Sequence, residues 1–357
     1  MAAIDLTPTF AGIARSVRFA DGAAVDAFFR ERFRKGFVDW FNGSIAGRGA
    51  WTVEFQGRVL PVTIGPPRGV TLDKLKERFA TFWDRAPALF GGAPTLLQFL
   101  SLASIFINEV RGHLVSVTEA YGRPGHPGVA YLFDAIPGLK VSYNNPDPAR
   151  PDNFPAGDLF HDPAFIAAHR GRALAARLAR TAQRAAWNGT NYALTGERTG
   201  GPEVEAGFIA QADFMKFRGR GLIQTTWRSN YRKLATYVTS YAGETPLLKS
   251  FAARWAGKDL DTVLTQSSNE DWDALFGDPA LELVLEAIRQ HSAANADYLT
   301  LAETAEGLNF VAASDAQLRQ ARGSIWHMGR RISGSGSYGR KFRGRVIELC
   351  NALGNGA

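Results

Sequence analysis

The chain has 357 residues, 45% of them hydrophobic and 21% charged, which excludes a disordered protein and predicts one or two folded domains. Lysine and arginine number 41 against 34 aspartates and glutamates, and the formal charge of +7 favours polyanionic partners such as nucleic acid or wall polymers. The single cysteine, Cys350, excludes an internal disulfide and a thiolate zinc site, and we expect it to be a buried helix residue.

The first 90 residues form an accessory block without any of the motifs described below. From Ala24 to Phe41, large apolar side chains recur near helical spacing with basic residues between them, which predicts one amphipathic helix. Two β-branched runs on either side of Gln56-Gly57 predict a short hairpin over 51–64. Thr71 is expected to cap a helix that ends near Arg85. The block either binds a partner or completes the core of the protein.

The segment from Pro94 to Ile107 is almost wholly apolar. It is shorter than the about 20 residues that a membrane-spanning helix requires, so we expect a buried core helix and no membrane span. Gly112 is a plausible stop for this helix, because glycine is the usual residue just past a helix end. The β-branched residues that follow predict an extended segment over 114–118.

The rest of the chain is predicted to be mainly helical. Residues 122–214 contain a proline-rich loop and an alanine- and arginine-rich helix over 163–187, and we interpret them as an inserted lobe. Further helices are predicted over 226–238, 278–305, 314–331 and 339–353. The fold class expected from these elements is mainly α, with a small β-hairpin component.

The run from Phe217 to Tyr231 combines glycines, carboxamides, hydroxyls and an aromatic ring at short offsets. Its glycines let the backbone turn tightly and approach a ligand. Its polar side chains and its tryptophan would complement the polar and apolar faces of a pyranose ring; these are Gln224, Thr226, Trp227 and Asn230. The alternative is a glycine turn followed by an ordinary amphipathic helix with Trp227 in the core.

Two carboxylates precede this run, Glu109 at the end of the apolar segment and Glu119 shortly after it. The later segment reads G-R-G-L-I-Q-T-T from Gly219 and ends in Asn230-Tyr231. These ordered blocks resemble the family 19 glycoside hydrolases, the plant-type chitinases and phage endolysins. A weaker third block is Ile332-Ser333-Gly334-Ser335, followed by a helix with Arg340 and Arg343.

The resemblance implies a lysozyme-like, two-lobed helical catalytic domain over residues 91–357. It implies that Glu109 is the general acid and Glu119 the general base. We expect Thr226 to hold the attacking water, and Gln224, Trp227 and Asn230 to bind the substrate. The sequence departs from the family at Asn108, where histidine is common, and at Ser333, which replaces an asparagine.

The spacing of the two glutamates constrains the local structure. On one continuous helix, Glu109 and Glu119 would be about 15 Å apart along the axis. An inverting pair needs about 6.5–9.5 Å, so the helix must end between the two residues. Burial beside the core favours a protonated carboxyl at Glu109, which suits an acid, while Glu119 on a more polar segment stays ionised.

These features predict an inverting glycoside hydrolase that cleaves β-1,4 linkages of N-acetylhexosamine polymers. Bacterial peptidoglycan is the expected substrate and chitin the alternative. A non-catalytic glycan-binding or cell-wall structural protein is the alternative from another class. No metal or cofactor is expected, because the sequence has no H-E-x-x-H, G-x-S-x-G or phosphate-loop motif.

The sequence also carries signals for location and partners. The N-terminal residues lack a basic patch followed by an apolar stretch, so we expect a cytoplasmic product that reaches the wall after release or by a non-classical route. The run Lys-Phe-Arg-Gly-Arg occurs at 216–220 and again at 341–345, which raises a nucleic-acid site as a rival interpretation. Helical arginines are usually a solvated face, and we expect a monomer without a nucleic-acid partner.

Overall fold

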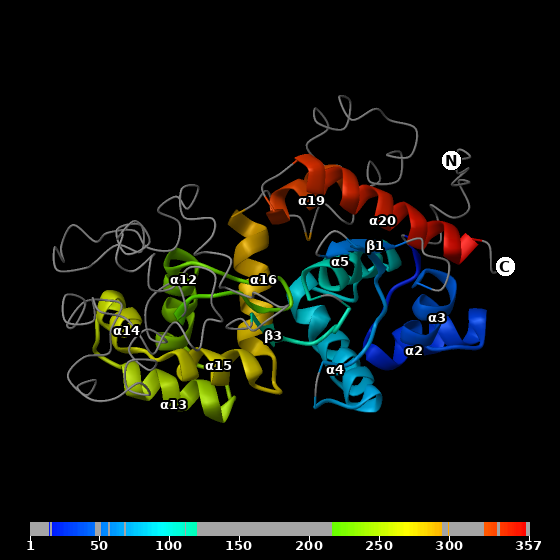
Figure 1. Cartoon of the computed structure of the whole chain (residues 1–357). Helices are drawn as coiled ribbons and strands as arrows, with labels where there is room; N and C mark the ends of the chain where they lie inside the picture. The colour runs from blue at the N-terminus through cyan, green and yellow to red at the C-terminus, as the bar shows by residue number, and fades with distance from the viewer. Residues whose placement is uncertain are drawn as a thin grey trace. The chain divides into compact units, whose positions relative to one another are not determined.

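Figure 1 shows the computed structural model of the chain. It describes residues 14, 16–46, 51–55, 58–67, 69–110, 112–119, 216–294, 299, 325–333 and 336–354. This part of the chain is mainly helical, which confirms the predicted mainly α class. The chain divides into two compact units: unit 1 is Met1–Val115 with Leu285–Ala357, and unit 2 is Ser116–Val284. The predicted inserted lobe over 122–214 and its helix lie outside the described residues.

The N-terminal part of unit 1 contains two helices where one was predicted. Helix α2 spans Gly22–Phe33 and helix α3 spans Phe37–Ser44, so the single helix expected over 24–41 is wrong. The helix breaks at Arg34, whose backbone is left-handed (φ 59°) and whose N–H still bonds the Arg30 carbonyl. Gly36 then lies against Asp26, where a Cβ would come within 2.3 Å of a carboxylate oxygen. A closely packed turn therefore replaces the middle of the predicted helix.

The hairpin and the helix after it are confirmed. Strands β1, Thr52–Phe55, and β2, Arg58–Pro61, pair antiparallel. Helix α4 spans Leu72–Phe90, and the Thr71 hydroxyl accepts a hydrogen bond from the Lys74 backbone N–H at 3.2 Å. The helix runs on past the expected end at Arg85, because it ends only where Gly91 takes a left-handed conformation.

Helix α5, Leu96–Glu109, is the predicted buried helix. It starts with a capping box in which Thr95 and Gln98 bond each other's backbone N–H groups. Every residue from Leu96 to Ile107 is buried. None of the helices in the described residues is both long and apolar enough to cross a bilayer.

The predicted stop at Gly112 is confirmed, and its physical cause is visible. Gly112 has a φ of +78°, and a Cβ at this position would lie 2.2 Å from the Thr63 carbonyl oxygen. The extended segment expected over 114–118 is right only for its last two residues, since Leu114 is left-handed (φ 50°) and strand β3 is Val117–Thr118. The chain turns twice after α5 before it reaches Glu119.

The core of unit 1 is a cluster of aromatic rings around Phe99 of α5. The ring centroid of Phe99 lies 4.6 Å from that of Trp83, 5.0 Å from that of Phe37, 5.4 Å from that of Phe19 and 5.8 Å from that of Phe29. These partners all come from the first 90 residues. The rings of the accessory block are therefore core side chains of unit 1, and any separate role of residues 1–90 stays a prediction.

Two C-terminal helices complete the described part of unit 1. Helices α19, Ile325–Ser333, and α20, Gly336–Gly354, lie side by side and are red in Figure 1. They pack closely because Gly339 lies against Trp326, whose carbonyl oxygen would be 2.8 Å from a Cβ there. The final helix thus extends beyond the predicted 339–353, and residues 314–324 of the preceding prediction lie outside the described residues. Cys350 is buried as expected, and burial raises its pKa to about 12.

Unit 2 is built on a two-stranded pairing that joins distant segments. Strand β3 pairs antiparallel with β4, Arg220–Gly221, in the register Val117 to Gly221 and Thr118 to Arg220. The helices of unit 2 are α12, Arg228–Thr239; α13, Pro246–Trp255; α14, Leu260–Gln266; and α15, Asn269–Gly277. Helix α16, Glu282–Ala294, begins in unit 2, and its residues from Leu285 onward belong to unit 1. The rings of Tyr231, Trp255 and Phe217 surround Trp272 in the core.

The helix predicted over 226–238 corresponds to α12 and is confirmed. The helix predicted to start at 278 begins later, at Glu282. An Asp278 carboxylate oxygen accepts the Ala280 N–H at 2.7 Å, and Leu281 is left-handed (φ 59°), so this stretch forms a turn. Local hydrogen bonding by an aspartate competes with helix formation here.

The glycine at the end of α5 provides a test of this fold. We expect Gly112→Ala to cost about 1–2 kcal/mol from the left-handed backbone, plus about 1–3 kcal/mol from the clash with Thr63. Gly91→Ala is the matched control, because Gly91 is also left-handed (φ 69°) but nothing lies within 4 Å of its Cβ position. Urea unfolding of both variants measures the difference, and equal losses would contradict the close approach.

Candidate active site

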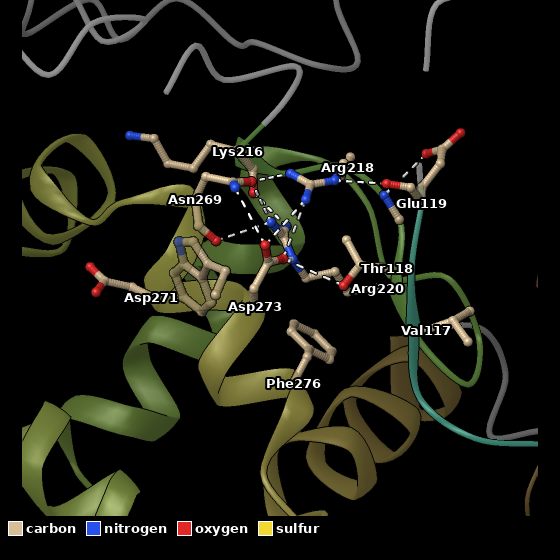
Figure 2. A network of polar contacts seen from close by, with 12 residues as sticks. Val117, Thr118, Glu119, Lys216, Arg218, Arg220, Asn269, Asp271, Asp273 and Phe276 are labelled. Carbon is tan, nitrogen blue, oxygen red and sulfur yellow. Dashed lines mark hydrogen bonds and ion pairs between the residues drawn. The ribbon is translucent and has the colours of Figure 1, made fainter. Parts of the chain in front are cut away.

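Glu119 is fixed mainly by the glycine-rich run of unit 2. Its backbone N–H donates to the Gly219 carbonyl at 2.8 Å, and its carbonyl accepts from Arg218 Nε at 2.9 Å. The Gly219 N–H donates to Glu119 Oε2 at 3.3 Å. Figure 2 shows Arg218 between Glu119 and Asn269. The half-buried carboxylate and the predicted sugar-binding run are therefore brought together.

Gln224 also converges on Gly219. A Cβ on Gly219 would lie 2.7 Å from Gln224 Oε1 and 3.4 Å from Glu119 Oε2, so a larger residue here would displace the Gln224 side chain. Gln224 is left-handed (φ 51°), and its Nε2 donates to the carbonyls of Gly221 at 3.0 Å and Val117 at 3.3 Å. The amide donors of Gln224 thus tie β3 to the turn after β4, while its oxygen faces the Glu119 side of Gly219.

Trp227 lies outside the core. Its side chain is 41% exposed, and its backbone is left-handed (φ 77°) where α12 begins. The Trp227 N–H donates to the Phe217 carbonyl at 2.9 Å, which fixes the turn that presents the ring. Asn230 Nδ2 donates to the Thr226 carbonyl at 3.0 Å. The half-buried Thr226 and the exposed Trp227 are therefore adjacent at the hydrogen-bonded start of α12.

A buried guanidinium underlies this run. Arg220 is fully buried, and its Nε donates to Asp273 Oδ1 at 2.7 Å. Its Nη1 bonds the Lys216 carbonyl at 2.5 Å and the Tyr231 hydroxyl at 2.9 Å. Its Nη2 bonds the Asn269 side-chain oxygen at 2.7 Å and the Asn269 carbonyl at 3.2 Å. All five N–H donors of this guanidinium are used.

The network explains why arginine and tyrosine occur at this spacing. The Tyr231 hydroxyl accepts from Arg220 and donates to the Arg218 carbonyl at 2.7 Å, which holds α12 against β4. Burial raises the pKa of Tyr231, although Arg220 opposes that rise. Burial lowers the pKa of Arg220, and attraction to Tyr231 and Asp273 more than offsets this, so the arginine stays charged.

Asn269 and Asp273 are site-supporting residues that the sequence analysis missed. Both lie on α15, four residues apart, so their side chains share one helix face. Asp273 also pairs with Arg218 Nη2 at 3.3 Å and accepts from the Thr118 hydroxyl at 3.4 Å. An amide and a carboxylate at helical spacing are the available signal in the sequence, but the same pattern is common on solvated helix faces.

Glu109, the predicted acid, is the last residue of α5 in unit 1. Its Oε1 accepts from the Tyr338 hydroxyl at 2.6 Å and from Asn108 Nδ2 at 2.8 Å. Asn108 Nδ2 also donates to the Tyr338 oxygen at 2.5 Å. Burial, followed by repulsion from Glu109, raises the pKa of Tyr338 well above its ordinary value, so the phenol stays a donor.

Asn108 is held in turn by Arg345 of α20. Arg345 Nη1 donates to Asn108 Oδ1, and its Nη2 donates to the Thr52 carbonyl at 3.1 Å. The guanidinium lies 4.8 Å over the ring of Trp51. Burial lowers the pKa of Arg345 to about 10. The weaker third block of the sequence drew attention to Arg340 and Arg343, whereas Tyr338 and Arg345 are the residues of α20 that bond Glu109 and Asn108.

The candidate residues divide between the two units. Glu119, Gln224, Thr226, Trp227 and Asn230 belong to unit 2, and Glu109 belongs to unit 1. The predicted pairing of the two carboxylates stays a prediction.

One of the two basic runs behind the nucleic-acid interpretation is buried. In the first Lys-Phe-Arg-Gly-Arg run, Lys216, Arg218 and Arg220 are all buried, so this run presents no basic surface. Lys216 Nζ, for example, donates to the Leu264 carbonyl at 2.9 Å. The two runs therefore cannot form two exposed basic patches that bind a nucleic acid together.

Among the described residues, no group of three or more His, Cys, Asp and Glu side chains is arranged to hold a metal ion. A pocket of about 430 Å³ lies in unit 1 between α2, α3 and α4. None of the candidate catalytic or substrate-binding residues lines it.

Comparison with protein-family models, curated proteins and solved structures found no match. The case for a function therefore rests on the residues and their contacts.

The buried network predicts a large cost for a small change. Tyr231→Phe removes one hydroxyl and leaves a buried carbonyl and a buried guanidinium N–H without a partner. We expect the free energy of unfolding to fall by about 1–3 kcal/mol or more. Ser250→Ala removes a hydroxyl from the exposed side of α13 and should change it by less than about 0.5 kcal/mol. Urea unfolding of both variants gives the comparison, and a neutral Tyr231→Phe would show that the network does not hold α12.

Proposed function

We propose that this protein is a glycoside hydrolase that cleaves β-1,4 linkages of N-acetylhexosamine polymers, with bacterial peptidoglycan as the substrate. The proposed fold is a lysozyme-like, two-lobed helical catalytic domain. The observation that supports the proposal most is the attachment of Glu119 to Gly219. The motif that suggests a sugar site is the same segment that positions a carboxylate.

The neighbours of Glu119 are suited to carbohydrate. Trp227 offers an exposed ring, and sugars bind aromatic faces through their apolar C–H surface. Thr226 precedes it with a hydroxyl, and the Gln224 oxygen flanks the same glycine as Glu119. A rigid turn that presents polar and apolar groups together costs little entropy when a ligand binds.

In the proposed inverting reaction, Glu109 protonates the glycosidic oxygen while Glu119, with Thr226, takes a proton from the attacking water. The bond from the anomeric carbon to the leaving oxygen breaks as water adds from the opposite face. Glu109 is the last residue of α5, and Tyr338 and Asn108 hold one oxygen of its carboxyl in place.

A second candidate is a glycan-binding protein without hydrolytic activity. Glu109 Oε1 accepts hydrogen bonds from Tyr338 and Asn108, so this carboxyl already has partners within the fold. An ionised Glu109 would bind a sugar hydroxyl but could not protonate a leaving group. Chitin is the second candidate substrate for either activity.

Glutamine variants test whether the two glutamates are required for activity. Glu109→Gln and Glu119→Gln should each lower the rate of wall lysis by about 10²–10⁴-fold, because each removes a proton-transfer group. Turbidity loss of outer-membrane-permeabilised bacteria and sugar release from colloidal chitin measure the rates. Glu244→Gln is the matched control, since that side chain is 91% exposed and should leave both rates unchanged. Full activity in Glu109→Gln would reject the proposed acid.

The stereochemistry of the product tests the mechanism. Inversion at a β-linked chain should give the α-anomer as the first product, measured by NMR before mutarotation. A β-anomer would instead indicate retention through a covalent or substrate-assisted intermediate. Binding to sacculi without new reducing ends would favour the non-catalytic candidate.

Trp227 should affect binding more than folding. Trp227→Ala should lower affinity for soluble glycan fragments by about 5- to 100-fold through loss of stacking, while the melting temperature changes little because the ring is exposed. Isothermal titration and thermal unfolding of the same preparations measure both. A large fall in melting temperature with unchanged affinity would assign the ring to packing.

A further inference from the structure

One face of α20 lies against the end of α5. Tyr338, Lys341 and Arg345 are spaced three and four residues apart, which places them on the same side of a helix. Tyr338 contacts Glu109, and Arg345 contacts Asn108. Lys341 lies between them on that face, so its position beside Glu109 follows from the helix geometry.

The three side chains differ in whether their hydrogen-bonding groups already have partners within the protein. The Tyr338 hydroxyl is used by Glu109 and Asn108, and Arg345 is used by Asn108 and the Thr52 carbonyl. Lys341 is exposed, and within the described residues it forms no hydrogen bond or ion pair. Partial burial and the charge of Arg345 lower its pKa, while Glu109 opposes that shift. An ammonium group beside the proposed acid is therefore open to a ligand.

The surroundings of Lys341 are strongly basic. Helices α19 and α20 carry Arg330, Arg331, Arg340, Lys341, Arg343 and Arg345, against Glu348 as their only acidic residue. Burial raises the pKa of Glu348, which weakens its contribution of negative charge further. An anionic group that approaches Glu109 from the solvent side would be attracted to this face, whereas a neutral group would gain nothing from it.

We propose that Lys341 binds a carboxylate of the glycan substrate close to the scissile bond, and thereby selects a carboxylate-bearing polysaccharide over a neutral one. This inference rests on the proposed function, because it assumes that Glu109 meets a glycan. Peptidoglycan carries carboxylates on the peptides attached to its sugars, and chitin has none. Lys341 is then a specificity-determining residue rather than a catalytic one.

The test removes the charge from each partner separately. Purified sacculi are compared with the same sacculi after their carboxylates have been converted to amides, for the wild-type protein and for Lys341→Gln. Arg331→Gln is the matched control, since it removes one exposed cation from the neighbouring helix α19. Bound protein is measured by sedimentation at low and moderate salt, and released reducing ends are measured in the same tubes.

We expect wild type and Arg331→Gln to bind native sacculi about fivefold better than amidated sacculi, as one partly screened ion pair allows. Lys341→Gln should bind both forms equally, at the amidated level. Equal binding of both sacculi by the wild type, or the same preference in Lys341→Gln, would overturn the inference. Failure of the proposed function is a distinct result: carboxylate-dependent binding through Lys341 with no reducing ends released.

Discussion

Burial of the Arg220 guanidinium is the constraint on which unit 2 depends. A charged group without water is tolerated only when its donors are satisfied, and Arg220 uses all five on Asp273, Lys216, Tyr231 and Asn269. These partners come from three separate segments of the chain, so the guanidinium fixes β4, the start of α12 and α15 at once. The position of Glu119 depends on the same network, because its backbone N–H donates a hydrogen bond to the carbonyl of Gly219, the residue before Arg220. The proposed catalytic base is thus held by a network that does not itself touch substrate.

The two candidate carboxylates are held in different ways, and the difference matches the roles proposed for them. Glu119 is positioned by backbone groups of Gly219 and by Arg218, which leaves its orientation tied to the strand pairing. Glu109 is positioned by the side chains of Asn108 and Tyr338. A base has to keep one position relative to a water molecule, whereas an acid needs one oxygen fixed and the other available to carry a proton. Asn108 connects Glu109 to α20, because its side chain forms hydrogen bonds with both the Glu109 carboxylate and Arg345.

Local signals in the sequence were sufficient where one segment determines its own structure. The apolar run with Thr95 before it predicted α5, and Gly112 predicted the end of that helix. The prediction failed at Arg34, where a left-handed residue with no sequence signature splits the helix. Tyr338, Asn269 and Asp273 could not be assigned to the site, because their partners are distant in sequence and polar residues on helices are usually solvated. For the run around Gly219, the sequence predicted a tight glycine turn but not that Glu119 and Gln224 would both lie against it.

Net charge is a property of the sequence, but attraction to a polymer depends on which charges reach the surface. Lys216, Arg218 and Arg220 count toward the +7 formal charge, yet all three are buried and bonded within unit 2. Their charge stabilises a fold and contributes little to the surface potential at short range. The exposed cations of α19 and α20 are different, because Arg330, Arg331 and Lys341 face solvent on helices with a single acidic residue. The C-terminal helices therefore present positive charge to solvent, whereas the buried arginines of the motif that first suggested a sugar site do not.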